Sequence, residues 1–478
     1  MKLTTESIWA DLAAWKREAR ALHHEPYALY RDFYTGGDRP LAYIRKNSRE
    51  SDEHWLERLG RLVGANYCAP IVNKPVQAEY GGRVRRSVAD PALQARLDAL
   101  ARANALHTFQ LQTARQRAID GTAIVQVFWD PSIMSIVSIV DRMDKMDAMG
   151  GGGVRLKHIL PEHFYPIVLD DCARLDAVII DRGGTVGGVS PRRVTRDGDV
   201  APTTAAPHRV EIYTPDDIAV YEDGVRVNPP MGYGALPFVV FNGRRLVGEV
   251  FGASMLRGIA ELNHALNESL NNVLEILRFQ AFSLLVIQGG LHGLPLDADG
   301  RPRLAVGEAG FLNIDAEGRV YFADPNPKIG EVLAVMDRLI AMMYETGSIP
   351  MAVVQPQQSH AESAAARQVQ FMPLVDLVEE LITFDLESER ELIEKALLVD
   401  ATHRAGPAAP GEVRRRLGRV EVEFPRRFLP VDEAARFELL RARREAGLLT
   451  RRMMLAAEHP EMSERELDGL EAQLERQA

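Results

Sequence analysis

The chain has 478 residues, of which 46% are hydrophobic and 26% are charged. These proportions are typical of globular proteins and exclude a largely disordered chain, and the length predicts two or more packed units. Acidic residues outnumber lysine and arginine by 67 to 57, a formal net charge of −10. This balance disfavours a protein that grips duplex DNA through a broad basic surface.

The cysteines and the N-terminus indicate a protein made in the cytosol. Cys68 and Cys172 stand far apart without a CxxC pattern, which predicts reduced, buried structural thiols. The N-terminal stretch MKLTTESIWADLAAWKREAR is charged throughout and lacks the apolar core of a signal peptide. No apolar run approaches the roughly 18–20 residues that would span a bilayer, so we expect neither secretion nor membrane insertion.

The first 120 residues have helical periodicity. Apolar residues recur at helical spacing over 5–24, which predicts one amphipathic helix ending near Pro26. A second helix is expected after Ser51, a residue suited to capping. Its apolar face comprises Trp55, Leu56, Leu59 and Leu62. A third helix is expected over about 91–119.

From residue 120 the pattern changes to β-branched and aromatic runs separated by glycine, proline and aspartate. The runs are AIVQVFWD, VSIVD, HFYPIVLD, LDAVIID, HRVEIYT, IAVYED and PFVVFNG. They predict a mostly antiparallel sheet region. Two glycine-rich stretches, at about 149–154 and 183–207, are expected to be mobile loops.

A long helix is expected from Ser254 to about Leu285, because proline is absent and Gly258 is the only glycine. Its apolar residues recur at heptad-like spacing and form a seam of Leu256, Ile259, Leu266, Leu270, Val273 and Leu277. A glycine-rich insert with short strand signals occupies 286–328, and a second helix follows over about 330–345. The chain is therefore expected to leave on one helix, form a small β module and return on another.

The stretch GSIPMAVVQPQQSHAESAAARQVQFMP, residues 347–373, has no lysine or arginine before Arg367. We interpret its first part as a polar loop before a long helix over about 362–399, in which Pro373 predicts a kink. A linker is expected at 402–412 and a strand at 419–425, and the remainder is expected to be helical, with Thr450 and Ser463 as N-caps.

No catalytic motif stands out in the sequence. GxxxxGK[ST], HExxH and GxSxG patterns are absent, and no cofactor or metal site is expected. The nearest approach to a metal-dependent nuclease site is Glu162 with Asp170 and Asp171. Adjacent carboxylates are more often turn residues, so function is expected to lie in assembly and shape.

Several stretches, in this order along the chain, carry a likeness to one family. They are YIRKNSRESDEHWLERLGRLVGANYCAPIVNKPV, AIDGTAIVQVFWD, ILPEHFYPIVLDD, FGASMLRGIAELNHALNESLNNVLEILRFQAFSLLVIQG, ETGSIPMAVVQ and VEVEFPRRFLPVDEAARFELLRARREAGLLT. The sequence resembles the portal proteins of tailed bacteriophages, including prophage and gene-transfer-agent relatives. The likeness covers most of the chain, and the long insertion at 183–207 departs from the family.

The resemblance implies an α+β portal-type fold, assembled as a ring. Its segments would be N-terminal helices and a β-rich wing (1–253), a first stem helix (254–285), a clip (286–328), a second stem helix (329–347), a tunnel loop (348–362), a long kinked wing helix (363–400), and a wing strand with a helical crown region (401–478).

The resemblance also implies a role. The ring, usually a dodecamer, would stand at one capsid vertex of a virion made in the bacterial host cytoplasm. Double-stranded DNA would pass through its channel without sequence specificity. The clip would contact the terminase large subunit and later a head-completion or tail adaptor protein, and the wing would contact the major capsid protein and scaffold. No enzymatic activity and no membrane partner are implied.

Two sets of residues receive channel roles from this resemblance. The polar loop residues expected to face DNA are Gln355, Gln357, Gln358, Ser359 and His360. Glu261, Glu268 and Glu275 are seven residues apart and share one helix stripe, which is expected to line the tunnel. The apolar seam is expected to pack between subunits. Asn263 within it either sets helix register or is half-exposed.

Two other classes remain open from the sequence. One is the metal-dependent nuclease built on Glu162, Asp170 and Asp171, which predicts magnesium-dependent DNA cleavage. The other is a monomeric scaffold or binding module, which predicts a single subunit in place of a ring.

Overall fold

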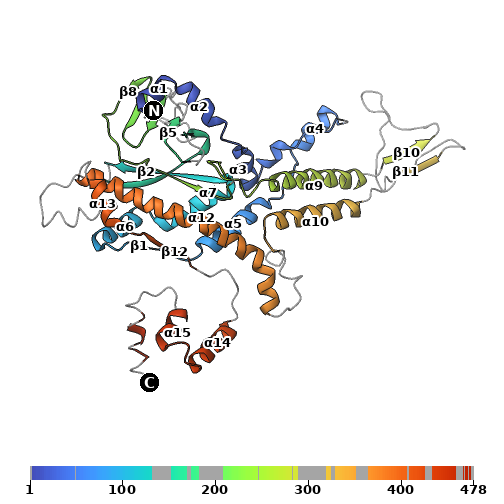
Figure 1. Ribbon diagram of the computed structural model, residues 1–478. Coiled ribbons are helices and arrows are strands. Elements are labelled where there is room, and N and C mark those ends of the chain that lie inside the picture. Colours follow the sequence, from blue (N-terminus) through green and yellow to red (C-terminus); the bar gives the residue numbers. More distant parts are fainter. Residues whose placement is uncertain are drawn as a thin grey trace, which may run out of the picture. The chain divides into compact units, whose positions relative to one another are not determined.

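The structure is a computed structural model that describes residues 3–48, 50–131, 152–169, 174–181, 208–245, 247–281, 284–288, 319–323, 329–350, 364–405, 409–425, 433–458, 467, 469–471 and 473–474. Helices and antiparallel sheets alternate along it, which confirms a mixed helix and sheet fold (Figure 1). The chain divides into two compact units. Unit 1 comprises Met1–Thr35, Cys68–Ala260 and Tyr344–Ala478, and unit 2 comprises Gly36–Tyr67 and Glu261–Met343.

Unit 1 contains most of the helices and all of the larger sheets. Its helices are α1 (Thr5–Ala10), α2 (Leu12–Arg20), α3 (Tyr27–Thr35), α5 (Cys68–Tyr80), α6 (Pro91–Ala103), α7 (Leu106–Asp120), η2 (Pro161–His163), α12 (Ala364–Ala405), α13 (Ala409–Leu417), α14 (Glu433–Glu445) and α15 (Arg451–Glu458). Its strands are β1 (Arg85–Ser87), β2 (Thr122–Asp130), β3 (Gly153–Ile159), β4 (Phe164–Ile167), β5 (Ala177–Asp181), β6 (Arg209–Tyr213), β7 (Ile218–Glu222), β8 (Val225–Arg226), β9 (Phe238–Asn242) and β12 (Glu421–Glu423).

The helix expected over 5–24 is in fact two helices. The chain leaves helical geometry at Asp11, which has φ −117° and ψ 30° and whose N–H donates to the Trp9 carbonyl. Aspartate favours such a break because its side chain competes with the backbone for hydrogen bonds. Thr4 caps α1 by accepting a hydrogen bond from the Ser7 N–H. The prediction of a single helix over 5–24 was therefore wrong.

The antiparallel sheet prediction is confirmed for the described strands. One sheet has the order β3-β2-β9 and another the order β4-β5-β6-β7-β8, and every pairing is antiparallel. The expected strand VSIVD and the insertion at 183–207 lie outside the described residues. The expected loop at 149–154 ends sooner than predicted, because Gly153 already pairs with Asp130 in β2. A Cβ at Gly152 would lie 2.6 Å from the Trp129 ring, so this position requires glycine.

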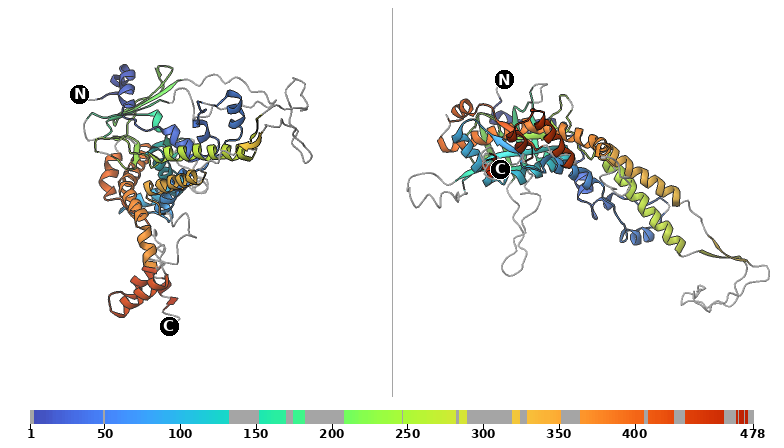
Figure 2. Two further views of the ribbon diagram at one scale, coloured as in Figure 1. Left: turned by 90° about the vertical axis from the view of Figure 1, so that its right-hand side faces the viewer. Right: turned by 90° about the horizontal axis from the view of Figure 1, so that it is seen from below.

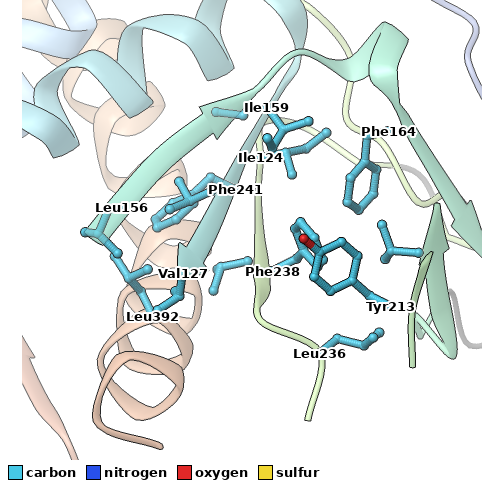
Figure 3. Packing of buried hydrophobic residues seen from close by; sticks show 14 of the residues in the cluster. Ile124, Val127, Leu156, Ile159, Phe164, Tyr213, Leu236, Phe238, Phe241 and Leu392 are labelled. Carbon is cyan, nitrogen blue, oxygen red and sulfur yellow. The ribbon is translucent and has the colours of Figure 1, made fainter. Parts of the chain in front are cut away.

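The five-stranded sheet is covered on both faces. Val178 and Ile180 of β5 belong to the larger core cluster, whereas Ala177 and Ile179 belong to a second cluster beneath α1 and α2. This alternation is the two-residue period of a strand. Figure 3 shows the larger cluster, in which the Tyr213 and Phe238 rings meet edge to face at 4.7 Å.

Helix α12 contacts β2, β9 and α5 (Figure 1), and it carries carboxylates into a buried ionic network. Arg117 of α7, which is 1% exposed, bonds to Asp385 of α12 and, at 2.6 Å, to Glu79 of α5. Arg86 holds Glu389 of α12 with two hydrogen bonds of 2.9 and 2.7 Å. Burial raises the pKa of Glu79, while Arg117 opposes that shift. These buried ion pairs link α5, α7 and α12 to one another and α12 to β1.

In the C-terminal part, the long helix, the strand and the Thr450 cap are observed, the linker is not, and Ser463 lies outside the described residues. α12 is helical on both sides of Pro373 and continues to Ala405, and α13 begins at Ala409, so helix occupies much of the expected linker 402–412. Pro410 does not disrupt α13, because a backbone N–H in the first turn of a helix has no partner within the helix and its absence in proline therefore costs no hydrogen bond. The strand expected at 419–425 is β12, which pairs with β1, and Thr450 caps α15 through the Met453 N–H.

The helices in the described part of the chain include none that is long and apolar enough to cross a membrane.

Candidate functional site

Unit 2 contains a helix-and-strand excursion in the order that the sequence predicted. Its elements are η1 (Pro40–Tyr43), α4 (Asp52–Leu59), α9 (Ile259–Ala281), β10 (Leu284–Gln288), β11 (Arg319–Ala323) and α10 (Ile329–Thr346), the ends of α9 and α10 reaching into unit 1. The first helix, α9, is shorter than the expected 254–285, because it begins at Ile259 and β10 already begins at Leu284. α9 leads into β10, β10 pairs antiparallel with β11, and α10 follows β11 (Figure 2). α9 has 23 residues, so its length is roughly 35 Å.

A ladder of three asparagines fixes an extended segment against α9. Asn263, Asn267 and Asn271 are four residues apart and therefore lie on one face of the helix. Their Oδ1 atoms accept hydrogen bonds from the backbone N–H groups of Tyr67, Ala65 and Val63 at 2.9, 2.8 and 2.9 Å, respectively.

The same amides also act as donors. Asn263 Nδ2 donates to the Ala65 carbonyl and Asn271 Nδ2 to the Val63 carbonyl, both at 2.8 Å. Side-chain amides thus replace the partner strand that an extended segment normally needs. Of the two alternatives for Asn263, the half-exposed position is wrong, because the residue is 1% exposed. The four-residue spacing of the other two asparagines was the available sequence signal, and the sequence analysis missed it.

The glutamate stripe is exposed at one end and partly covered at the other. Glu261 is exposed, and the Glu268 side chain is 44% exposed. The Glu275 side chain is 16% exposed, and its Oε2 lies 3.3 Å from His54 Nε2. Glu268 Oε1 also lies 3.8 Å from His264 Nε2. Two members of the stripe therefore keep solvent-exposed carboxylates, whereas the third belongs to a cluster with α4.

That cluster attaches α4 to its preceding loop. His54 Nδ1 lies 2.7 Å from Glu50 Oε1, and Arg58 donates to Glu50 Oε2 at 3.2 Å. Although burial alone would raise the pKa of Glu50, the Asn47 N–H, His54 and Arg58 lower it. Ser51 accepts from the His54 N–H, which confirms the predicted cap of this helix.

The apolar seam is largely covered within the chain. Leu256, Ile259, Leu266 and Val273 are buried, Leu270 is half-buried and Leu277 is 45% exposed. The expectation that the whole seam packs against a neighbouring subunit is therefore wrong for the four buried positions. The physical reason is that this chain already covers those residues, so that they need no second copy.

Other apolar side chains of unit 2 remain on the surface. The residues are Leu56, Leu59, Val63, Leu274, Leu277, Leu333, Val335 and Met342. They come from α4, the segment after it, α9 and α10. Leu56 and Leu59 are exposed whereas Trp55 and Leu62 are half-buried, so the apolar face predicted for the helix after Ser51 is only partly open to solvent. Such a group of exposed apolar residues is typical of an interaction surface.

Several predicted site residues lie outside the described residues. They are Gln355, Gln357, Gln358, Ser359, His360, Asp170 and Asp171. The third residue of the nuclease alternative, Glu162, is described, and both of its oxygens accept hydrogen bonds from Arg31 at 2.7 and 3.0 Å. Within the described ranges, no group of three or more histidine, cysteine, aspartate or glutamate side chains is arranged to hold a metal ion.

No protein-family model matches the chain. No curated protein matches it either. Among the chains of solved structures that are similar to it, two come from gene transfer agent particles. One is described as the virion of a native gene transfer agent particle, with 13% identity, a TM-score of 0.41, and 89% of this chain and 96% of that chain covered. The other is described as the neck of an empty gene transfer agent particle computed with C6 symmetry, with 13% identity, a TM-score of 0.41, and 85% and 93% covered.

Proposed function

We propose that this chain is the portal subunit of a tailed-phage-like particle, forming a ring through which double-stranded DNA enters and leaves the capsid. The observation that carries the proposal is the excursion α9–β10–β11–α10, followed by the 42-residue helix α12, a strand and C-terminal helices. This order matches the stem, clip, stem, wing and crown segments that the sequence resemblance implies.

The surface of unit 2 supports assembly into a ring. Its exposed apolar side chains, described above, would be covered by equivalent surfaces of adjacent copies, because repeated contacts of this kind close into a ring. The interface would therefore lie on the exposed parts of α4, α9 and α10, with Leu277 as the one exposed seam residue.

The channel chemistry is carried by Glu261, Glu268 and the loop 355–360. Repeated around a ring, the two exposed carboxylates would form anionic bands that repel the DNA backbone. This repulsion would act over roughly 8–10 Å, because dissolved salt screens it at longer distances. Loop residues without lysine or arginine would avoid the phosphate contacts that hold DNA in place. The terminase and the adaptor would dock at the segment between β10 and β11, and the capsid protein and scaffold at unit 1.

Ring formation is tested directly by electron microscopy and native mass spectrometry of the purified full-length chain. Rings with a central hole are expected, and twelve copies of a 53.1 kDa chain have a mass of roughly 640 kDa. A persistent monomer would overturn the proposal. Magnesium-dependent DNA cleavage by the same preparation would favour the nuclease instead.

The anionic bands are tested with the double variant Glu261→Lys and Glu268→Lys, leaving Glu275 with its histidine partner. The amount of nuclease-protected DNA per particle should fall while rings persist. Glu18→Lys, the same charge change at an exposed position of α2 in unit 1, is the matched control and should package normally. Equal packaging by all three proteins would remove the bands from the proposal.

The loop is tested by deletion of residues 355–360. Rings should still form, because none of the apolar surface residues named above belongs to the loop, whereas particles should retain less DNA. Normal DNA retention with intact rings would contradict the role proposed for Gln355, Gln357, Gln358, Ser359 and His360.

A further inference from the structure

A cavity of about 490 Å³ lies in unit 1 beside β9, and none of the described residues that line it belongs to α9 or α10. Its wall is built by the strand, by the segment before β5, by the segments on either side of β9, by α12 and by α13. The portal proposal leaves this cavity without a role.

Cationic side chains dominate its charged lining. Arg174, Arg245, Lys395 and Arg414 face one carboxylate, that of Glu391. Lys395 Nζ lies 2.7 Å from Glu391 Oε1, so these two charges largely neutralise each other. The three arginines leave the cavity with a positive surplus, in a chain whose net charge is negative.

The three arginines differ in how they are held. Arg414 donates to the Gly234 carbonyl at 3.3 Å and lies 3.6 Å from Glu394. Arg174 and Arg245 are exposed, and neither forms an ion pair with any residue that the structure describes. Two guanidinium groups are thus available to bind carboxylates in the bidentate geometry that arginine favours.

The floor of the cavity is apolar. Phe238 is fully buried there, while Leu175 and Val240 are only half-buried at the edge of the larger core cluster (Figure 3 shows Phe238 and Leu236 within it). An apolar side chain placed on Leu175 and Val240 would extend this core and remove further apolar surface from water.

We propose that the cavity binds an acidic peptide segment of a partner protein, with its carboxylates paired to Arg174 and Arg245 and one apolar side chain seated on Leu175 and Val240. A peptide fits better than a nucleic acid for two reasons. The volume accepts a few side chains but no duplex, and an apolar floor has no counterpart in a phosphate backbone. The proposal does not depend on the ring or on DNA.

The test uses the purified full-length chain and a short fluorescently labelled peptide with glutamates flanking a leucine–phenylalanine pair. Fluorescence anisotropy should show saturable binding that weakens as salt rises. Arg245→Glu and Arg174→Glu should each weaken binding by about tenfold or more, the equivalent of one lost ion pair in a partly dry site. The same peptide with glutamine in place of glutamate should not bind.

Arg415→Glu is the matched control, because Arg415 is an exposed neighbour of Arg414 on α13 and does not line the cavity. It should bind the peptide like the unaltered chain. All three substitutions change exposed side chains, and equal melting temperatures verify that folding is intact. The proposal is overturned if the peptide does not bind, if all three variants bind it equally, or if a labelled DNA duplex competes for the same arginines.

Discussion

In unit 1, β5 buries side chains on both faces, and the charges that enter the interior are paired, as Arg117 is with Glu79 and Asp385. In unit 2, asparagine amides attach an extended segment to α9, and residues such as Leu56 and Leu277 stay exposed. Unit 1 thus pairs charges within its interior, whereas unit 2 exposes apolar side chains on α4, α9 and α10. Stability is therefore expected to depend most on unit 1, and the proposed assembly on unit 2.

The largest effect is expected from Arg117→Met, which leaves two carboxylates buried without their cation. The free energy of unfolding of unit 1 should fall by about 3–5 kcal/mol, measured by denaturant titration of the full chain. Adding Glu79→Gln and Asp385→Asn should restore part of the loss. Arg115→Met is the control. Arg115 lies two residues earlier on α7 and donates to Asn73 at 3.2 Å, so its loss should have a much smaller effect; equal losses would contradict the importance of the buried network.

The free energy of unfolding of unit 1 is expected to depend on pH through His158. Burial lowers its pKa to about 4, against roughly 6.5 in an unfolded chain. Between these values the unfolded state binds the extra proton, so stability falls as the pH falls.

The loss from this histidine is at most about 3 kcal/mol between pH 7 and pH 4. His158→Phe keeps a ring beside Phe109 and should remove this component, so that its stability falls less steeply over the same window. Identical slopes in denaturant titrations of the two proteins would show that His158 does not titrate as described.

In unit 2, Asn267→Ala removes the acceptor of the Ala65 N–H. Because this donor is only partly buried, the expected cost is about 1 kcal/mol, at the lower end of the range for an unpaired donor. Amide hydrogen exchange should accelerate at Ala65 and, to a lesser degree, at Val63 and Tyr67. The exposed neighbour Asn272→Ala is the control. Faster exchange throughout unit 1 as well would argue against a local ladder.

The smallest effect on the isolated chain is expected from Leu56→Ser. Because this side chain is 68% exposed, the free energy of unfolding should change by less than about 0.5 kcal/mol. Assembly, measured by native mass spectrometry, should be impaired if the exposed surface is an interface. A large loss of monomer stability would mean that Leu56 packs within its own chain.

Much of the secondary structure was predictable because it follows local periodicity and capping. The strand AIVQVFWD, the helix after Ser51 and the helix–strand–helix order from residue 254 to 347 all leave such signals. Two features were not predictable in that way. The break at Asp11 depends on a single residue within a continuous helical pattern, and coverage of Leu266 and Val273 depends on segments distant in sequence. The pairing of Asn267 with Ala65 joins residues 202 positions apart, which no local pattern contains.

The three asparagines of the ladder bond to backbone N–H and carbonyl groups of the extended segment, and these bonds do not involve its side chains. At Val63, Ala65 and Tyr67 these hydrogen bonds therefore do not restrict the type of side chain, with one exception: proline at any of the three would remove the N–H that donates to an asparagine oxygen. A surface whose shape is constant and whose chemistry can vary is well suited to following a changing partner.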